Sequence, residues 1–160
     1  MSKKLILYFS YTGNTKYIAE FLHEKIEADI CEIKLEQPYS ENYDVVVEQG
    51  KQEVKENYLP TMKPLDFDLN QYDTIILGTP VWWYTFAPAI HTVLKQYDFT
   101  NKTIFPFITN GGWIGHTIKD IEKSCPDSKI MNPINIRFNN DTLVTPILEI
   151  TNWIELVNGK

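Results

Sequence analysis

The feature that most constrains this chain is a short loop of hydroxyl side chains and glycine between an apolar run and an amphipathic stretch. The apolar run is Leu5–Phe9, the loop is Ser10–Thr15 with the sequence SYTGNT, and the amphipathic stretch begins at Lys16. A strand that ends in such a loop and passes directly into a helix brings free backbone N–H groups and the positive helix end to one point. The sequence therefore predicts an anion site here, and phosphate is the ligand we expect.

The composition of this loop narrows the kind of phosphate. It contains no lysine and lacks the glycine spacing of nucleoside-triphosphate and dinucleotide loops. The donors that remain are neutral hydroxyls and amides, which suit a terminal phosphate monoester better than a bridged pyrophosphate. An ordinary strand-to-helix turn capped by Thr12 or Asn14 would have the same composition, so the loop alone does not decide between the two.

Length and composition predict one globular domain over residues 1–160, with 43% hydrophobic residues to build its core. The first apolar run is too short for a signal-peptide core or a membrane span, so we expect a cytoplasmic protein with no membrane partner. Cys31 and Cys125 are far apart in sequence and match no metal or redox spacing. We expect both to be free, buried thiols, and no metal site is predicted.

The net charge of −6 and the presence of a single arginine, Arg137, argue against nucleic acid as a partner. Acidic residues are concentrated between residues 36 and 58, where six acidic and two basic side chains give a net charge of −4. This segment is interpreted either as a docking face for a basic partner or as a solvated surface helix.

Hydrophobic periodicity predicts alternating strands and helices. Strands are expected at 4–9, 30–35, 74–77, 103–109 and 129–136, and helices at 14–28, 88–97, 117–123 and 146–158, with the acidic segment partly helical. Pro106 lies within the fourth strand and removes a hydrogen-bond donor, so a bulge or another irregularity is expected there. The alternation predicts an α/β fold of three layers, with a doubly wound, five-stranded, mostly parallel sheet covered on both faces.

Ligands of such sheets bind at the carboxyl ends of the strands, where three unusual loops should meet. The first is Ser10–Thr15, the second is Thr79–Phe86 with four aromatic residues in five positions, and the third is Asn110–His116 with three glycines and a tryptophan. Exposed aromatic rings call for a flat ligand, and glycines allow the backbone to approach its polar edge. A phosphate cradle combined with these features predicts a site for flavin mononucleotide (FMN).

Three segments resemble the flavin-binding loops of the flavodoxins, in the same order and spacing. They are Tyr8–Thr15, Gly78–Trp83 and Thr109–Gly112, and the pair of tryptophans is similar to one flavodoxin-like branch. The resemblance covers nearly the whole chain. It implies the sheet order 2-1-3-4-5, FMN at the strand tips, and a role in carrying electrons or reducing small acceptors.

The resemblance also implies which residues bind the cofactor. Trp82 falls where flavodoxins stack an aromatic ring on the flavin, Trp83 competes for that role, and Trp113 is a candidate to cover the other face. His116 is interpreted either as a neighbour of the flavin or as a surface residue. The predicted cofactor-binding residues are Ser10, Tyr11, Thr12, Gly13, Asn14, Thr15, Thr79, Pro80, Val81, Trp82, Trp83, Tyr84, Thr109, Asn110, Gly111, Gly112, Trp113 and Gly115.

One departure from the flavodoxin pattern bears on function. Flavodoxin carriers commonly have a glycine close after the stacking aromatic, whereas no glycine occurs here between Gly78 and Gly111. Because a Cβ atom disfavours positive φ, Tyr84 and Thr85 are expected to resist the peptide rotation that accompanies one-electron reduction. This leaves room for two-electron chemistry.

Two functions are therefore predicted. The first is a flavodoxin-like electron-transfer protein, whose redox partner proteins, a reductase and an acceptor, dock at the flavin edge. The alternative is an NAD(P)H-dependent FMN reductase that acts on quinones or other small acceptors. A phosphoacceptor receiver domain of the same fold is poorly supported, because Thr79 and Pro80 stand where its aspartate would be needed.

Overall fold

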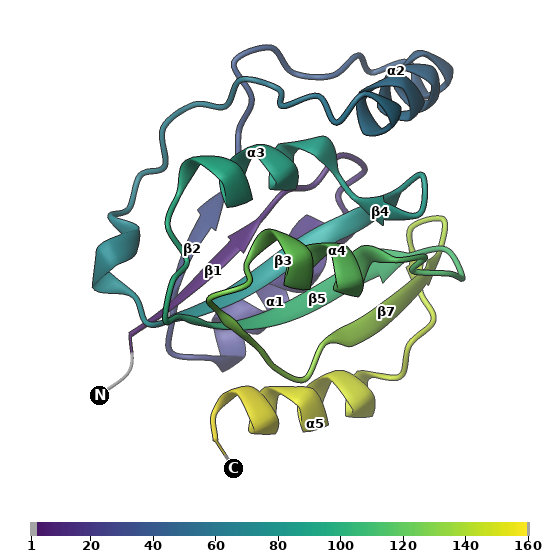
Figure 1. Ribbon diagram of the computed structural model, residues 1–160. Coiled ribbons are helices and arrows are strands. Elements are labelled where there is room, and N and C mark those ends of the chain that lie inside the picture. Colours follow the sequence, from purple (N-terminus) through teal and green to yellow (C-terminus); the bar gives the residue numbers. More distant parts are fainter. Residues whose placement is uncertain (1–2, 160) are drawn as a thin grey trace.

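A parallel sheet forms the centre of the computed structural model, which describes residues 3–159 (Figure 1). Its five parallel strands lie in the order β2-β1-β3-β5-β7. In chain order, with β6 and β7 taken as the fifth strand, this is the predicted order 2-1-3-4-5. The strands are β1 (Lys4–Tyr8), β2 (Asp29–Glu32), β3 (Thr74–Trp82), β5 (Thr103–Asn110) and β7 (Ile134–Asn139).

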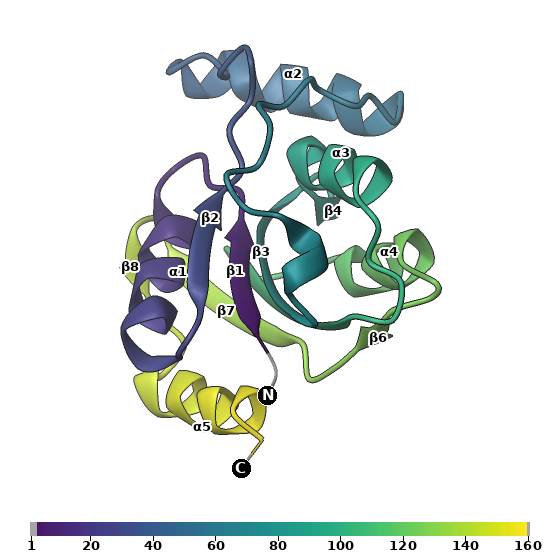
Figure 2. The ribbon, with the colours of Figure 1, turned by 90° about the vertical axis from the view of Figure 1, so that its left-hand side faces the viewer.

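Helices cover both faces of this sheet, as Figure 2 shows. Alternation along β1 sends Leu5 and Leu7 into a core shared with α3 and α4, whereas Ile6 and Tyr8 pack in a second core with α1 and α5. The predicted three-layer, doubly wound arrangement is confirmed. The helices are α1 (Asn14–Lys25), α2 (Tyr43–Lys55), α3 (Pro88–Gln96), α4 (Thr117–Ser124) and α5 (Ile147–Val157), with a 3₁₀ turn, η1, at Leu69–Gln71.

The expected irregularity at Pro106 takes the form of a break in the neighbouring strand. On the β3 side the register runs through Pro106 without a bulge. On the opposite edge of β5, the N–H of Met131 donates to the carbonyl of Ile104 at 2.8 Å. The next hydrogen bond along this edge would need an N–H from residue 106. Because proline has none, the predicted strand 129–136 is divided into β6 (Lys129–Ile130) and β7.

The prediction that Thr79–Phe86 is a loop is wrong. The third strand, expected to end at Leu77, continues to Trp82 because it keeps pairing with β5 up to Pro80 and then pairs antiparallel with β4 (Thr85–Phe86). The turn of this hairpin consists of Trp83 and Tyr84 alone. A second short antiparallel strand that the sequence did not predict, β8 (Thr142–Leu143), follows β7.

The acidic segment is partly helical, as predicted, and its helix is α2. In both ribbon views α2 lies beyond the carboxyl ends of the strands, to one side of the layer formed by α3 and α4 (Figures 1 and 2). Asn42 caps its first turn by accepting a hydrogen bond from Val45 N–H at 3.2 Å. This position places α2 over the end of the sheet where the predicted loops meet.

Candidate cofactor site

A cavity of about 760 Å³ opens at the carboxyl ends of the strands. It is enclosed by the loop after β1, the end of β3 with its turn, the end of β5, helix α2 and the β7–β8 hairpin. This is the expected position for a ligand in a doubly wound sheet. The predicted site residues that line it are Tyr11, Thr12, Asn14, Pro80, Val81, Trp82, Trp83, Thr109, Asn110 and Gly111.

The loop after β1 has the geometry of an anion site. Gly13 has φ 103°, a left-handed conformation that glycine adopts easily, and α1 begins at the next residue. Lys16 N–H donates to Ser10 Oγ at 3.2 Å. The amides of residues 11–15 have no acceptor among residues 3–159, so several N–H groups converge on the positive end of α1.

Thr15 and Thr109 connect this loop to the third loop. Both side chains are buried, and their Oγ1 atoms are 2.7 Å apart. Either hydroxyl can donate to the other, and the pair keeps one further O–H hydrogen for a ligand. Thr12, in contrast, is exposed and lines the cavity directly.

Trp82 forms the deep aromatic wall of the cavity. Its ring contacts Phe9 and Tyr11 edge-on, at centroid distances of 5.9 and 6.0 Å, and Tyr39 at 4.9 Å. On the other side Gly50 of α2 is so close that a Cβ atom there would lie 3.0 Å from Trp82 Cε3. Trp82 is therefore fixed by its neighbours, and the part of it that stays exposed faces the cavity.

Trp83 links the hairpin turn to α2. Its Nε1–H donates to the carbonyl of Val47 at 3.0 Å, and Lys51 Nζ lies 5.3 Å from its ring centroid. Its side chain remains 37% exposed and lines the cavity beside Trp82. Both tryptophans are thus available to a planar ligand.

The turn already has positive φ at both of its residues, while the expected resistance to peptide rotation on reduction stays a prediction. Trp83 has φ 50° and Tyr84 has φ 72°, the conformation of a two-residue hairpin turn that usually contains Asn-Gly. Left-handed backbone costs a residue with a Cβ atom about 1–2 kcal/mol, so surrounding contacts must hold it. His116 N–H donates to the Tyr84 carbonyl at 2.8 Å, and a Cβ on Gly115 would lie 2.2 Å from that oxygen.

The remaining predicted residues do not line the cavity. Thr79 is fully buried, and its hydroxyl accepts from Ala87 N–H at 3.1 Å and donates to the Pro80 carbonyl at 2.8 Å, which supports the start of α3. Thr15 is buried behind the first loop, and Trp113 is largely exposed outside the cavity. The others that do not line it are Ser10, Gly13, Tyr84, Gly112 and Gly115.

Sequence reasoning missed two walls of the cavity. One is a face of α2, whose residues recur at positions i, i+3, i+4 and i+7, a helical stripe that the acidic composition obscured. The other is the β7–β8 hairpin, signalled by the turn-forming run at residues 139–141, whose Asn140 carbonyl accepts from Asn14 Nδ2 at 2.7 Å. The missed lining residues are Tyr43, Val46, Val47, Gly50, Phe138, Asn140 and Asp141.

A buried carboxylate anchors α2 near the C-terminal end of this helix. Glu53 is 7% exposed, and it accepts hydrogen bonds from Tyr39 Oη at 2.6 Å and Gln49 Nε2 at 2.8 Å. Burial, together with this bond to Glu53, raises the pKa of the Tyr39 phenol well above its usual range. The acidic segment is thus more than a solvated face, since one of its acids holds the cavity wall in place.

The fold and the position of the cavity define a doubly wound α/β protein with an anion site and an aromatic wall at one edge of its sheet. Residues 3–157 match the family model described as Flavodoxin, and the chain belongs to the flavodoxin family. No curated protein matches the chain. Within residues 3–159, no helix has the length and apolar character needed to cross a bilayer.

Solved structures agree with this assignment. A Bacteroides eggerthii protein provisionally named a flavoprotein is 27% identical, with full coverage of both chains and a TM-score of 0.83. A Lactobacillus acidophilus flavoprotein in complex with FMN is 25% identical over 96% of this chain and 99% of that chain, with a TM-score of 0.75. A Fusobacterium nucleatum flavodoxin bound to FMN is 16% identical, covers 99% and 98% of the two chains, and shares the fold with a TM-score of 0.56.

Proposed function

We propose that this chain binds FMN and uses it to transfer electrons between redox partner proteins. The observation that carries the proposal is the pairing of unsatisfied amides at residues 11–15 with a wall of Trp82 and Trp83 across one cavity. Membership of the flavodoxin family supports it. So does the FMN bound to the Lactobacillus acidophilus relative.

The residues present fit this cofactor. The amides of residues 11–15 and the Thr12 hydroxyl would hold the phosphate, and Trp82 or Trp83 would contact the flavin ring. Asn110 and Gly111 would face its polar edge. FMN supplies one- and two-electron redox chemistry when bound, and the protein supplies binding, orientation and electrostatics.

The negative charge of α2 supports the proposal that the partner proteins have basic docking surfaces. Asp44, Glu48 and Glu56 are exposed in and just after α2, which forms one wall of the cavity. Acidic side chains beside a redox site accelerate encounter with a basic partner, and salt weakens this effect. A reductase and an acceptor are thus proposed to dock over the α2 side of the cavity mouth.

A second candidate, an NAD(P)H-dependent FMN reductase acting on small acceptors, is favoured by a different observation. Tyr84 and Trp113 expose large aromatic surfaces next to the cavity, where a small planar molecule would find a contact. The two candidates differ in which molecule supplies the electrons. Bleaching of the bound flavin by NADPH, with no other protein present, would favour the reductase.

FMN binding is tested by titrating FMN and riboflavin, which lacks the phosphate, into the wild type and Thr12→Ala. Because a hydrogen bond to a charged group contributes about 1.5–3 kcal/mol, Thr12→Ala should weaken FMN binding at least about tenfold and leave riboflavin binding unchanged. Thr100→Ala, at an exposed site at the opposite end of β5, is the matched control. Equal losses for both ligands would overturn the phosphate assignment.

Electron transfer is tested with photoreduced, FMN-loaded protein and cytochrome c, a basic one-electron acceptor. The rate should fall as salt is added, and it should fall at low salt in the variant Asp44→Asn/Glu48→Gln. Lys119→Gln, which changes one exposed charge on α4, is the control for a general charge effect. A rate that is independent of salt and of the α2 charges would contradict docking on this side.

A further inference from the structure

Two exposed aromatic rings stand beside the cavity without lining it. Tyr84 is 51% exposed and Trp113 is 67% exposed, and their ring centroids are 5.1 Å apart with planes tilted by 52°. Both rings are close in sequence to residues that line the cavity: Trp83 directly precedes Tyr84, and Gly111 is two residues before Trp113. Two rings that contact each other and leave most of their surface in water offer a platform for a flat ligand.

Main-chain contacts hold this pair in place. Tyr84 keeps its left-handed backbone, and its carbonyl accepts the N–H of His116. Gly115 packs directly against the Tyr84 backbone and leaves no room for a Cβ atom. The turn and the third loop are therefore fixed to each other, and strained backbone of this kind is concentrated at functional sites.

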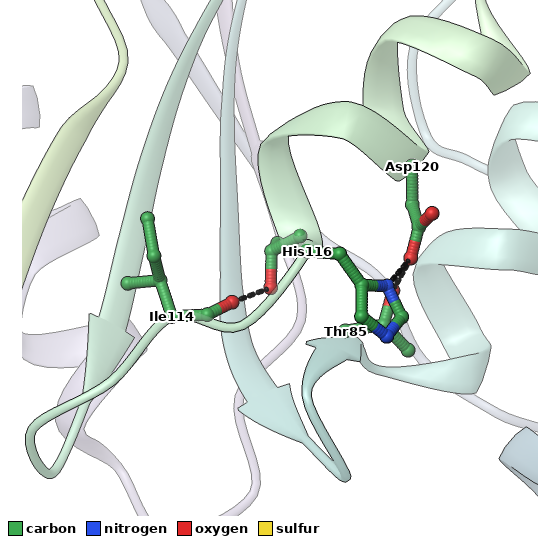
Figure 3. Close-up of polar contacts among 5 residues, drawn as sticks. Thr85, Ile114, His116 and Asp120 are labelled. Atoms are coloured by element: carbon green, nitrogen blue, oxygen red, sulfur yellow. Dashed lines mark hydrogen bonds and ion pairs between the residues drawn. The ribbon is translucent and has the colours of Figure 1, made fainter.

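His116 adjoins this pair through its main chain, whose N–H donates to the Tyr84 carbonyl. Figure 3 shows its imidazole and the side chain of Thr85 both directed at the carboxylate of Asp120. His116 Nδ1 contacts Asp120 Oδ2, and the same oxygen accepts Thr85 Oγ1 at 2.5 Å. Because a carboxylate accepts hydrogen bonds, Nδ1 carries a proton in this contact, and Nε2 has no partner among residues 3–159.

We propose that Tyr84, Trp113 and His116 form a subsite for a quinone, which takes electrons from the cofactor. The two rings would contact the flat face of the quinone, and His116, when both ring nitrogens are protonated, would donate from Nε2 to one of its carbonyl oxygens. The side chain of His116 is 57% exposed, so this nitrogen is accessible to a small molecule. The inference rests on the proposed binding of FMN, and it holds whether a partner protein or a nicotinamide reduces the flavin.

Reduction of a quinone to a hydroquinone requires two electrons and two protons. Bound FMN in its reduced form would supply one of the two protons and both of the electrons that convert the quinone to the hydroquinone. The imidazolium of His116 releases the other proton from Nε2 to a quinone oxygen, and the product is the hydroquinone. Neutral His116 regains its proton from water, while Asp120 holds the ring in orientation.

The charged and titratable groups near His116 could also contribute to the pH dependence of the quinone reaction. Asp120 is four residues after His116 and contacts its imidazole. Asp120 also interacts with His91 of α3. The pKa of His91 is lowered by burial and by Lys95, and Asp120 opposes this shift only in part. His116 is the more exposed of the two histidines. A change in pH dependence that follows substitution of His116 alone therefore identifies that imidazole.

Binding is tested by titrating naphthoquinone into oxidised, FMN-loaded protein, where no electrons are available to react. The chain has four tryptophans, so four indole N–H signals are expected in a nitrogen–proton correlation spectrum. The signal of Trp113, assigned with Trp113→Phe, should shift. The signal of Trp153, whose Nε1 donates to the Asn132 carbonyl away from the site, should not shift.

Turnover is tested by reducing the FMN-loaded protein and following its reoxidation by naphthoquinone and by ferricyanide, which needs neither a platform nor a proton. His116→Gln should slow the quinone reaction by about tenfold or more, because general acid catalysis contributes at least that much, and should change how the rate depends on pH. Trp113→Ala should also slow it. Tyr58→Ala, at an exposed aromatic residue outside the site, should not.

The outcomes separate this subsite from the cofactor site. Titration with FMN precedes each measurement, and a wild type that fails to bind FMN overturns both proposals. If FMN binds but naphthoquinone leaves the Trp113 signal unmoved, or the variants react with naphthoquinone at the wild-type rate, only the subsite is overturned. Loss of FMN from Trp113→Ala, or equal slowing with ferricyanide, would assign these rings to the cofactor and overturn the subsite as well.

Discussion

The hydroxyls of Thr15 and Thr109 form a hydrogen bond of 2.7 Å between the first turn of α1 and the end of β5. Thr15 is 1% exposed and Thr109 is 3% exposed, so water cannot replace either partner readily. The bond joins the anion loop to the third loop and thereby fixes two sides of the cavity relative to each other.

Thr109→Val should lower the free energy of unfolding by about 1–3 kcal/mol, because it leaves the buried Thr15 hydroxyl without a partner. Urea unfolding of the FMN-free protein measures this loss. Thr109→Ser keeps the hydroxyl and should retain most of the stability. Since replacing both partners removes the unsatisfied group, the double variant Thr15→Val/Thr109→Val should be more stable than Thr109→Val, and an equal or lower stability would contradict the hydrogen-bond account.

Gly50→Ala is expected to disturb the cavity wall although alanine is the better helix former. The gain in helix propensity is about 1 kcal/mol, while forcing an extra methyl group into packed surroundings costs about 1–3 kcal/mol. Trp82 cannot move away easily, because Phe9, Tyr11 and Tyr39 surround its ring. We therefore expect a net loss of stability and a shift in tryptophan fluorescence.

The control for this substitution is Gly111→Ala, which also lines the cavity. A Cβ atom there would have no neighbour within 4 Å, and its φ lies outside the positive range. Unfolding and fluorescence of the FMN-free protein should therefore stay close to wild type. A stabilised Gly50→Ala protein would show that α2 shifts to accept the methyl group.

Tyr39→Phe should loosen α2 by removing one of the two hydrogen bonds to the buried carboxylate of Glu53. Leaving a buried acceptor unsatisfied costs about 1–3 kcal/mol, and more for a charged group. Hydrogen exchange of the α2 amides should accelerate together with the fall in stability. Tyr17→Phe, at an exposed tyrosine whose hydroxyl has no partner within residues 3–159, should leave both unchanged.

The sequence predicted the arrangement of the cofactor site better than its walls. Alternating periodicities predicted the two-sided sheet, and the carboxyl-end rule placed the loops at Ser10–Thr15 and Asn110–His116 together. The cavity-lining stripe of α2 that begins at Tyr43 was missed, because the charged residues around it are typical of a solvent-exposed helix. Local propensity also disfavours Trp83 and Tyr84 at positive φ, and only contacts distant in sequence, from Val47 and His116, hold them there.

The cysteines give a prediction about alkaline pH. Burial raises the pKa of the Cys125 thiol from 9.0 to about 11, so the folded chain keeps a proton that the unfolded chain loses. A folded-state pKa above the unfolded value contributes stability that is complete below pH 9.0 and is lost as pH rises toward 11. At about 1.4 kcal/mol for each pKa unit, this contribution is about 3 kcal/mol.

The free energy of unfolding of the wild type should therefore fall more steeply between pH 9.0 and 11 than that of Cys125→Ala. Burial also raises the pKa of Tyr8, Tyr39, Tyr72 and Cys31, but these groups act equally in both proteins and cancel in the difference. A thiol reagent such as dithionitrobenzoate should label Cys125 slowly at neutral pH and rapidly once the protein unfolds, because the thiol is buried and protonated. Parallel stability curves for the two proteins, or fast labelling of the folded chain, would show that Cys125 is accessible to water.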